Sequence, residues 1–544
     1  MKKQEAQITE VTKASVEVYL PSRFKERFAK GDDRKLNTSI KDYCQLLYQS
    51  LFNEKSLEIE YSLNYTQEKD ATIRINNNQC RLANQIRKKP PNLTDWSHVS
   101  TYCCEGIFQN RLLLLTNERV EEIILTSDNE FDRLSFNDKY KICCYLIKYC
   151  HSLSRFQTVT NLSKSEDLKD PSDCFELIVN SLDALSLKID LAFDLQNSKH
   201  PADEYSLEDV LNTMNDGLFK ELGIYCPQPE LSINNNLLAN QFQIWLNDLP
   251  LPIYYTLSND YFLCNRPSEN INQNISNPGI YNHANFADFS IREIKDLPTV
   301  KEIGYTWGTA GVIVLHLSRI IRENSGVWVN INVTKAIFEK IENAYFLKEL
   351  FLKRFDLIYL TKVLRKLSSE AVTLRHINKI LETLISAGDF MELDNSKIEF
   401  LPDLNVLSLK KGEIFDAQSD WQKMGELMRK ALREEFSIQL TNQTYKLNVF
   451  LIDRVLENSL IFSDFENSNE LKKELINSLS TELEGLSSST MVHCILVSDL
   501  ARRIIQEAIE IEYPFLKVVS YRELSPSVHV TPIATLTPRI GSPA

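Results

Sequence analysis

The chain has 544 residues, a formal net charge of −13 and a pI of about 5.3, and 43% of its residues are hydrophobic. This length predicts more than one domain, and the acidic balance argues against the basic surface that a nucleic-acid partner requires. The sequence has only 14 glycines and contains neither a GxGxxG nor a GxxxxGK motif, so we expect no nucleotide cofactor.

The cysteines and the N-terminus indicate a reducing compartment. The eleven cysteines form no pair of CxxC motifs, which predicts buried thiols and no metal site. Residues 1–13 lack the apolar core of a signal peptide, and no window reaches the roughly 18 apolar residues of a membrane helix. We therefore expect a cytoplasmic protein that does not insert directly into a membrane.

The N-terminal part predicts a small α/β arrangement. Residues 16–20 alternate as in a strand, and apolar residues recur at helical spacing over 40–51. Two further strands are expected near 57–61 and 71–75, and the three asparagines at 76–78 indicate a turn.

The same series of elements recurs later in the chain. The second series is expected at residues 187–191, 207–218, 231–233, 242–246 and 247–248. The matching positions are Ser15 and Ser186, Leu51 and Leu218, and Asn76 and Asn247. We interpret this order as an internal duplication, although a shared βαββα pattern also arises by convergence.

The two series differ by an insertion. In each, a tryptophan-led helix follows, which we expect to open at Asp95-Trp96 and at Thr306-Trp307. About fourteen residues precede this helix in the first series and more than fifty in the second, so residues 254–304 form an inserted subdomain. Later helices match as well, after Phe131-Asp132 and Phe355-Asp356.

The C-terminal third begins as an all-helical region and ends as an α/β region. Periodicity is helical over 334–386, and a strand, a helix from Asp499 and two more strands close the chain. The first of these strands and the one after the helix form a right-handed parallel unit.

One string in this last region carries a resemblance. Ser498-Asp499-Leu500, Arg502-Arg503, Tyr513-Pro514, the segment 518–521, Glu523-Leu524 and Pro526 resemble the C-terminal end of the FHIPEP-type gate subunits of type III secretion and flagellar export. Segments 217–223, 304–306 and 360–384 resemble the same family in the same order. The resemblance covers roughly residues 186–535, the family's cytosolic part, and the family's transmembrane helices have no counterpart here.

The resemblance and the repeat together predict the organisation of the chain. We expect a multi-subdomain α/β (α+β) fold with mixed sheets, an all-α subdomain and a degenerate N-terminal duplication. The expected parts are a degenerate copy (1–162), a linker (163–185), a first α/β subdomain (186–253 and 305–332), the insert (254–304), a helical subdomain (333–400), a C-terminal α/β subdomain (401–535) and a tail (536–544).

No constellation of residues indicates catalysis. None of the eight histidines stands in a catalytic pattern: His316 lies in an apolar helical stretch, His376 on a polar helix face, and His493 and His529 in expected strands. The paired carboxylates suit solvated helix or loop ends. We therefore expect no catalytic residue and no cofactor.

Aromatic residues in and beside the insert are the candidates for binding. A subdomain of about fifty residues buries few aromatics fully, so some either fill its junction with the body or line a groove for a protein. By the resemblance, the groove candidates are Phe286, Phe289, Tyr305, Trp307 and Val312, and a chaperone that carries a secretion substrate docks there.

The resemblance implies a non-enzymatic component of a type III secretion or flagellar export apparatus, at the periphery of the inner membrane. Its implied partners are secretion chaperones with their substrates, other subunits of the apparatus and further copies in a ring. A detached regulator or adaptor that competes for chaperones or caps the gate is the alternative, and an enzyme on a similar fold is less favoured. We also expect the N-terminal copy to pack against the second as a degenerate neighbouring subunit.

Overall fold

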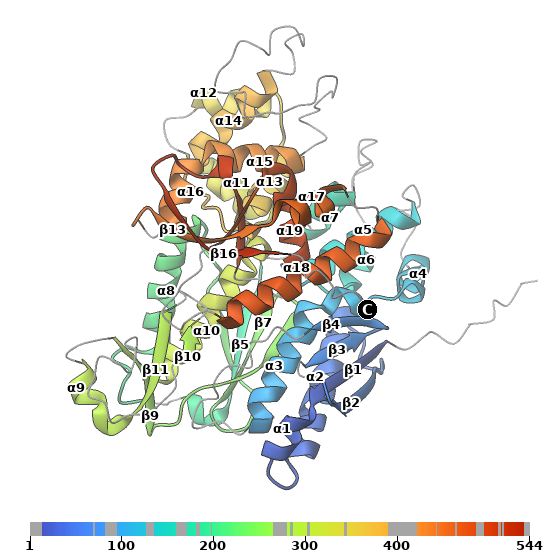
Figure 1. Cartoon of the computed structure of the whole chain (residues 1–544), viewed down its shortest axis with the longest axis vertical. Helices are drawn as coiled ribbons and strands as arrows, with labels where there is room; N and C mark the ends of the chain where they lie inside the picture. The colour runs from blue at the N-terminus through green and yellow to red at the C-terminus, as the bar shows by residue number, and fades with distance from the viewer. Residues whose placement is uncertain are drawn as a thin grey trace, which may run out of the picture. The chain divides into compact units, whose positions relative to one another are not determined.

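The computed structural model describes residues 14–68, 71–81, 95–126, 135–158, 171–180, 185–196, 199–264, 280–282, 287–301, 305–341, 345–389, 421–441, 443–462, 465–485, 494–509, 513 and 516–537 (Figure 1). They belong to two compact units. The first comprises Met1–Met214 and Pro227–Arg319, and the second comprises Asn215–Cys226 and Ile320–Ala544. The elements form mixed α/β sheets and an all-helical part, which confirms the expected fold class.

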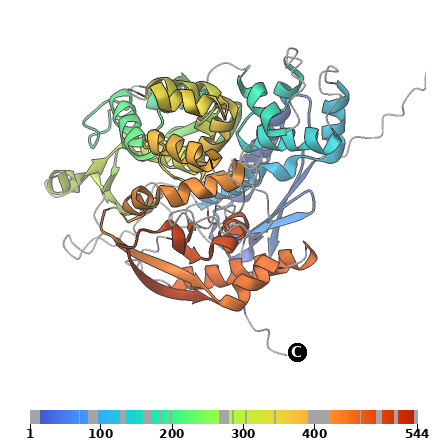
Figure 2. The same ribbon diagram turned by 90° about the horizontal axis from the view of Figure 1, so that it is seen from above.

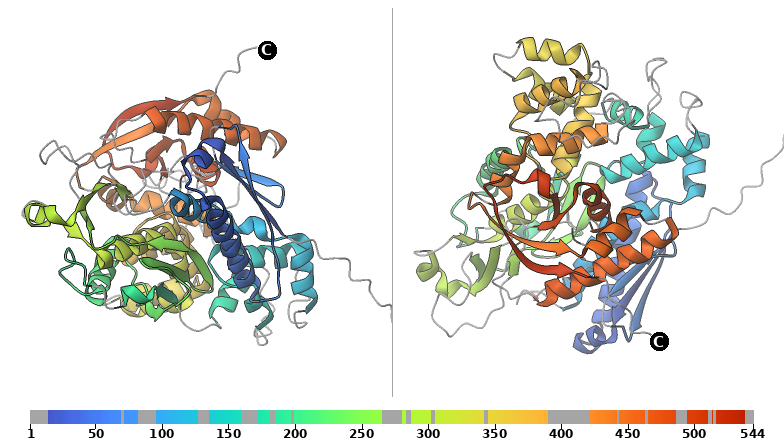
Figure 3. Two further views of the ribbon diagram at one scale, coloured as in Figure 1. Left: turned by 90° about the horizontal axis from the view of Figure 1, so that it is seen from below. Right: turned by 45° about the horizontal axis from the view of Figure 1, so that its top comes forward.

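The first unit begins with an α/β module, coloured blue to cyan in Figure 3. Its elements are β1 (Ser15–Pro21), α1 (Ser22–Arg27), α2 (Asp32–Phe52), β2 (Glu60–Thr66), β3 (Thr72–Ile75), β4 (Asn78–Arg81), α3 (Asp95–Gln109), the 3-10 helix η1 (Arg111–Leu114), α4 (Asn117–Thr126), α5 (Phe136–Lys148), α6 (Ser154–Thr158) and α7 (Pro171–Asn180). The sheet order is β2-β1-β3-β4, with β1 parallel to β2 and antiparallel to β3. Val16, Val18 and Leu20 alternate along β1 and are fully buried, because alternate side chains of a strand point to one face.

A second α/β module follows; most of it belongs to the first unit, and residues 215–222 and 320–323, at the ends of two of its helices, belong to the second. Its elements are β5 (Leu187–Leu191), η3 (Phe193–Leu195), α8 (Leu207–Leu222), β6 (Glu230–Ile233), β7 (Gln241–Leu246) and β8 (Leu249–Tyr255), and it is completed by α10 (Thr309–Glu323). The sheet order is β6-β5-β7-β8, with β5 parallel to β6 and antiparallel to β7, and β8 antiparallel to β7. The order and the strand directions therefore match those of the first module.

Strand β8 corrects one expectation. We placed Tyr254 and Tyr255 at the start of the insert, but both lie in β8, at the edge of the body's sheet. The sequence did not predict this strand because it contains Pro250 and Pro252. A proline cannot donate a hydrogen bond to a neighbouring strand and is confined to edge strands and bulges.

The insert is a small sheet of its own, seen as the yellow-green projection in Figure 2. It contains β9 (Tyr261–Cys264), β10 (Ile280–Asn282), β11 (Ala287–Glu293), η5 (Ile294–Asp296), α9 (Leu297–Lys301) and β12 (Thr306–Trp307), in the order β10-β11-β9-β12. We expected Thr306-Trp307 to open a helix. These residues instead pair with β9, and α10 begins two residues later, because the strand is held by the insert before the helix can start.

The expected linker also contains a helix. Residues 163–170 lie outside the described part of the chain, but residues 171–180 form α7, which packs against α5. The ring of Phe175 lies 5.3 Å from that of Tyr149, so the second half of this segment belongs to the folded module.

The second unit begins with helices, as expected. They are η6 (Ser325–Trp328), α11 (Ile331–Glu339), α12 (Tyr345–Leu352), α13 (Leu357–Ser369) and α14 (Ile377–Asp389), followed by α15 (Trp421–Ala431) and α16 (Arg433–Leu440). Helix α13 is capped by the side chain of Asp356, which accepts from the amide of Tyr359 at 2.7 Å. Its apolar face is wholly buried at Leu360, Val363 and Leu364.

A parallel sheet closes the second unit, orange to red in Figure 3. Its elements are β13 (Lys446–Ile452), α17 (Arg454–Phe462), α18 (Phe465–Gly485), β14 (Cys494–Val497), α19 (Asp499–Ile509), β15 (Lys517–Ser520), η9 (Tyr521–Glu523) and β16 (His529–Leu536). The order is β15-β14-β13-β16, and every neighbouring pair is parallel. The expected β14-α19-β15 crossover is confirmed.

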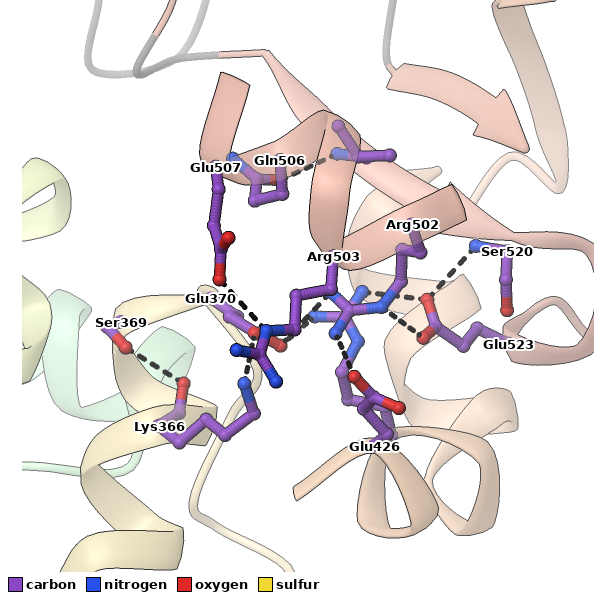
Figure 4. Close-up of polar contacts among 12 residues, drawn as sticks. Lys366, Ser369, Glu370, Glu426, Arg502, Arg503, Gln506, Glu507, Ser520 and Glu523 are labelled. Carbon is purple, nitrogen blue, oxygen red and sulfur yellow. Dashed lines mark hydrogen bonds and ion pairs between the residues drawn. The ribbon is translucent and has the colours of Figure 1, made fainter. Parts of the chain in front are cut away.

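Charged residues tie the helical part of the second unit to this sheet (Figure 4). Glu370, at the end of α13, receives Arg429 of α15 at 3.0 Å and Arg502 of α19 at 3.4 Å. The same two arginines reach Glu523 of η9, at 2.8 and 3.2 Å. Lys366 contacts Glu370 at 3.0 Å, and Glu426 contacts Arg502 at 3.5 Å. We call these six residues the buried charge network, and their formal charges sum to zero.

The electrostatic balance of this network depends on the arginines. Burial alone would raise the pKa of Glu370, but the charges of Arg429, Arg502 and Lys366 outweigh burial and lower that pKa to about 2. The pKa of Arg429 is raised above its ordinary value, because Glu523 and Glu370 outweigh the burial that would lower it. The carboxylate of Glu370 is therefore ionised at neutral pH.

Two negative expectations concern membranes and thiols. None of the helices in the described ranges combines the length and the hydropathy that crossing a bilayer requires. The eleven cysteines all lie in described parts of the chain, none of them forms a disulfide bond, and most are buried. Burial raises the pKa of Cys103 to about 12, so this thiol stays protonated.

Candidate protein-docking site

The first turn of α10 is capped by a residue from the loop before α8. Asp203 Oδ1 accepts hydrogen bonds from the amides of Gly308, at 2.8 Å, and Gly311, at 3.3 Å. Its Oδ2 accepts from the amide of Ala310 at 2.9 Å. A carboxylate that satisfies these amides also complements the positive end of the helix dipole. This cap fixes where the chain enters α10.

A histidine packs under the same turn. The ring of His200 is buried, its Nδ1 accepts from the amide of Ala202 at 3.1 Å, and its Nε2 therefore donates to the carbonyl of Tyr261 at 2.9 Å. This ring lies so close to Gly308 that a Cβ there would be 2.3 Å from Nδ1. The loop, the insert and α10 are thus joined at one point.

An apolar cluster on one face of the insert sheet holds Trp307. Its buried members are Leu257, Leu263, Ile291 and Val312, with Tyr261, Trp307 and Leu315 packed against them. Trp307 pairs with Leu263 across β9 and β12, and it touches Gly311, where a Cβ would be 2.5 Å from its side chain. Trp307 is therefore a half-buried residue with a fixed position.

The five groove candidates have different surroundings. Tyr305 is 74% exposed, and its ring lies 6.3 Å from that of Trp307. Val312 is only 5% exposed, so it is part of the core beneath this surface and does not line it. Phe289 lies in β11 opposite Ile280, and its side chain is outside the described part; Phe286 lies wholly outside it. Tyr305 and Trp307 are thus the candidates that the structure brings together.

The other face of the insert sheet contains a buried arginine. Arg292 is opposite Phe262 in the β9–β11 pair, so both share the face that carries Ala202, Leu297 and Val300. Its side chain is 1% exposed, and none of its three guanidinium nitrogens has a hydrogen-bond partner among the described residues. An unpartnered buried cation is strongly unfavourable.

Replacing Arg292 with methionine is expected to stabilise the chain by about 1 kcal/mol or more, because an apolar side chain of similar length needs no acceptor. Urea denaturation of both proteins measures the change. The matched control is Lys295→Met in the same insert, since Lys295 is exposed and paired with Glu293, and its loss should leave the urea midpoint unchanged. A destabilised Arg292→Met protein would contradict the expectation and would indicate an acceptor for the guanidinium.

A protein-family comparison identifies the class of protein. The FHIPEP family matches residues 140–401 and 403–529, which is more than half of the chain. The chain belongs to the FHIPEP family. Two curated relatives of this FHIPEP chain are Low calcium response locus protein D of Yersinia pestis, 21% identical over 368 residues, and flagellar biosynthesis protein FlhA of Bacillus subtilis, 22% identical over 330 residues. These alignments cover 65% and 58% of this chain but 48% and 44% of the relatives, so the chain spans about half of their length.

Solved structures show the same fold. The CdsV protein of Chlamydia pneumoniae is similar with a TM-score of 0.52 at 18% identity, over 65% of the FHIPEP chain and 98% of CdsV. A structure of CdsV with CdsO gives a TM-score of 0.53 at 19% identity, over the same shares of the two chains. The fold expected from the FHIPEP resemblance is therefore confirmed.

Sequence reasoning missed two residues of the site in this FHIPEP chain. His200 and Asp203 lie about 105 residues before the turn that they support. Their sequence signal is weak, because an aspartate in a loop is ordinary unless the amides that it caps are known. The sequence signal that could have found them is the pair Gly308 and Gly311, because glycines allow the close contacts seen at the start of α10.

Proposed function

We propose that this chain is a non-enzymatic component of a type III secretion or flagellar protein-export apparatus, acting at the cytoplasmic side of the inner membrane. The family and the curated relatives support this assignment, since they are gate and biosynthesis proteins of such systems. Other subunits are the first class of partner, and CdsV, which shares the fold, has been solved in complex with CdsO. Further copies of the chain in an assembly are the second class.

We propose further that a chaperone carrying a secretion substrate docks on the aromatic pair Tyr305 and Trp307. The observation that carries this proposal is the combination of an exposed ring with a neighbouring ring on a rigid support. The support consists of the β9–β12 pairing and the capped start of α10. Aromatic side chains in fixed positions are typical anchors of protein interfaces, because little conformational freedom is lost when they bind.

Binding of a chaperone–substrate pair from the same organism tests the docking proposal. Tyr305→Ala is expected to weaken binding by about 2 kcal/mol without changing the melting temperature, because this side chain is exposed. Trp307→Ala should weaken binding and also lower the melting temperature, since Trp307 packs on the apolar cluster. Titration calorimetry and thermal melts of each variant separate the two effects.

The matched control is Tyr345→Ala, since Tyr345 is 81% exposed and lies on α12, outside the proposed site. Its affinity and its melting temperature should stay at the values of the unchanged chain. Unchanged affinity in Tyr305→Ala would reject docking on this aromatic pair, whereas loss of affinity in both variants would indicate a wider surface.

A second candidate function is that of an adaptor that caps a gate or competes for its chaperones. The observation in its favour is the N-terminal module, most of which precedes the residues that match the family. Chaperone binding does not distinguish the two functions. Co-purification with the membrane-embedded apparatus separates a gate component, which should be present in stoichiometric amounts, from a competitor for chaperones, which should be absent.

A further inference from the structure

The two α/β modules share more than their strand order. In the first, the amide of Ser15 donates to Asn76 Oδ1 at 2.8 Å, and the amide of Asn76 donates to the Ser15 carbonyl at 3.0 Å. In the second, Ser186 and Asn247 make the same two bonds, at 3.0 and 2.9 Å. Both asparagines have positive φ, 46° and 49°, a conformation that asparagine adopts more readily than most residues. The turn after β3 and the turn after β7 thus share the same two hydrogen bonds and the positive φ of the asparagine.

The helix that follows each sheet also ends in the same way. The backbone and side-chain amides of Asn110 both donate to the Gly106 carbonyl, at 3.1 and 2.8 Å. Those of Asn324 donate to the Ile320 carbonyl at 3.0 and 2.9 Å. A 3-10 helix begins at the next residue in both cases, η1 after α3 and η6 after α10.

A third correspondence lies at α5 and α13, which both have 13 residues. Each leads into a residue of positive φ, Cys150 at 62° and Ala371 at 56°. Three residues later, the amide of Leu153 donates to the Leu51 carbonyl at 2.7 Å, and that of Leu374 to the Leu222 carbonyl at 2.8 Å. Leu51 thus corresponds to Leu222, one helical turn beyond the Leu218 expected from the sequence.

The corner after these two helices receives a different segment in each module. In the first module, Tyr149 and Cys150 accept from Asn247 Nδ2 and from the amide of Asp248, at 3.2 and 3.1 Å. Asp248 Oδ2 in turn accepts from the amide of Ser152 at 2.9 Å, and the carboxylate pairs with Arg155. At the end of α13, in the second unit, the residue that corresponds to Tyr149 is Glu370, which receives the arginines of the buried charge network.

The rest of the contact between the modules covers the edge strand β8. Tyr43 Oη, from α2, donates to the Pro250 carbonyl at 3.2 Å, and Thr101 Oγ1, from α3, donates to the Ile253 carbonyl at 2.9 Å. An ion pair of 2.6 Å joins Glu105 of α3 to Arg319 of α10. An uncovered edge strand presents free backbone groups to other chains, and here side chains of the first module bind two of them.

We propose that the N-terminal module arose by duplication of the second α/β module and acts as a permanently attached neighbouring subunit. Its α2–α3 face and the corner at residues 149–155 form a docking surface. The partner that this surface fits is the β7–β8 edge of a second α/β module. Within one chain the attached module meets this edge at high effective concentration, so it excludes the same contact from a second chain. The proposal goes beyond the export function, since it concerns how many chains associate and not what they carry.

The test uses the full chain with a protease site inserted within residues 181–184, between α7 and β5, so that cleavage separates the two modules. After cleavage, the two fragments should elute together from a size-exclusion column at micromolar concentration, and dilution with light-scattering detection should give their dissociation constant.

Burial alone would raise the pKa of Asp248, but the hydrogen bonds from His151, Arg155 and Ser152 and the charge of Arg155 outweigh burial and lower that pKa. Asp248→Ala and Arg155→Ala should each weaken the association about tenfold or more, and the double variant should lose less than the product of the two.

A matched control variant and a measurement of assembly size complete the experiment. Asp194→Ala removes a carboxylate of the same module that binds the amide of Asn240 instead, so it should leave the association unchanged. Uncleaved Asp248→Ala/Thr101→Val protein should form larger assemblies than the unchanged chain, because the β8 edge is then released. Fragments that separate freely in the unchanged protein, or variants with unaltered association and assembly size, would overturn the proposal.

Discussion

Replacing Glu370 with glutamine should reduce the free energy of unfolding of the second unit by about 3 kcal/mol at neutral pH. The carboxylate of Glu370 lies between Arg429 and Arg502, both of which are nearly fully buried. Glutamine keeps the size of the side chain but removes its charge, so two buried guanidinium groups are left with one carboxylate fewer. Removal of one partner from a buried network is strongly destabilising for this reason.

The loss should depend on pH in one direction. The pKa of Glu370 is lowered from 4.5 to about 2 in the folded chain, because the neighbouring cations outweigh the burial that would raise it. The ionised carboxylate therefore stabilises the folded state above about pH 4.5, and this contribution is lost as the pH falls towards 2. Urea denaturation of the unchanged chain and Glu370→Gln at pH 7 and pH 3 should show a smaller difference at the lower pH.

Glu434→Gln is the matched control for this substitution. Glu434 lies in the same unit and is about half exposed, with Arg433 as a partner at 3.7 Å. Its loss should change stability by less than about 0.5 kcal/mol. If Glu370→Gln is no more destabilised than this control, the arginines are neutralised by Glu523 and Glu426 alone.

Gly308→Ala should destabilise the first unit by about 2–4 kcal/mol. The added methyl group would lie 2.3 Å from the buried ring of His200 and 2.8 Å from Oδ2 of Asp203. Either the ring or the carboxylate must move, and movement of Asp203 breaks the cap on α10. Thermal melts and chaperone binding should both be impaired, since Trp307 is positioned by this turn.

The control for Gly308→Ala is Gly217→Ala. Gly217 is exposed in α8, and no atom lies within 4 Å of the position of an added Cβ. Alanine at this helical position should stabilise the chain by about 0.5–1 kcal/mol. Opposite signs for the two substitutions would establish that crowding at Gly308, and not the loss of glycine itself, is responsible. An unchanged melting temperature in Gly308→Ala would mean that His200 can move aside.

The sequence predicted those parts of the fold that depend on local periodicity. Strand β1, with its alternating valines, and the β14-α19-β15 unit were correct because side-chain spacing alone defines them. The turn at Asn76 was also expected, and both Asn76 and Asn77 have positive φ. Strand β8 was missed, because its two prolines contradict a strand unless it is known to lie at an edge.

Features that join distant segments could not be predicted. Arg502 and Glu523 were part of the motif that carried the family resemblance, but their partners Glu370 and Arg429 lie 132 and 94 residues away in the sequence. At the candidate site, Tyr305 and Trp307 stay predictions, whereas the assignment of Val312 to the groove did not allow for the cluster that buries it. Spacing in a sequence does not specify which face of α10 the insert covers.

The division of the chain into units has a consequence for its synthesis. Residues 215–226 belong to the second unit although they lie within the sequence of the first, and the Leu222 carbonyl accepts from the amide of Leu374. At about 5–20 residues per second, roughly 8–30 seconds separate the translation of these two leucines. During that interval the end of α8, including the apolar Leu218 and Leu222, lacks the segment around Leu374 to which it is hydrogen-bonded in the folded chain. Chaperones that bind nascent chains should therefore contact this segment until Leu374 has been made.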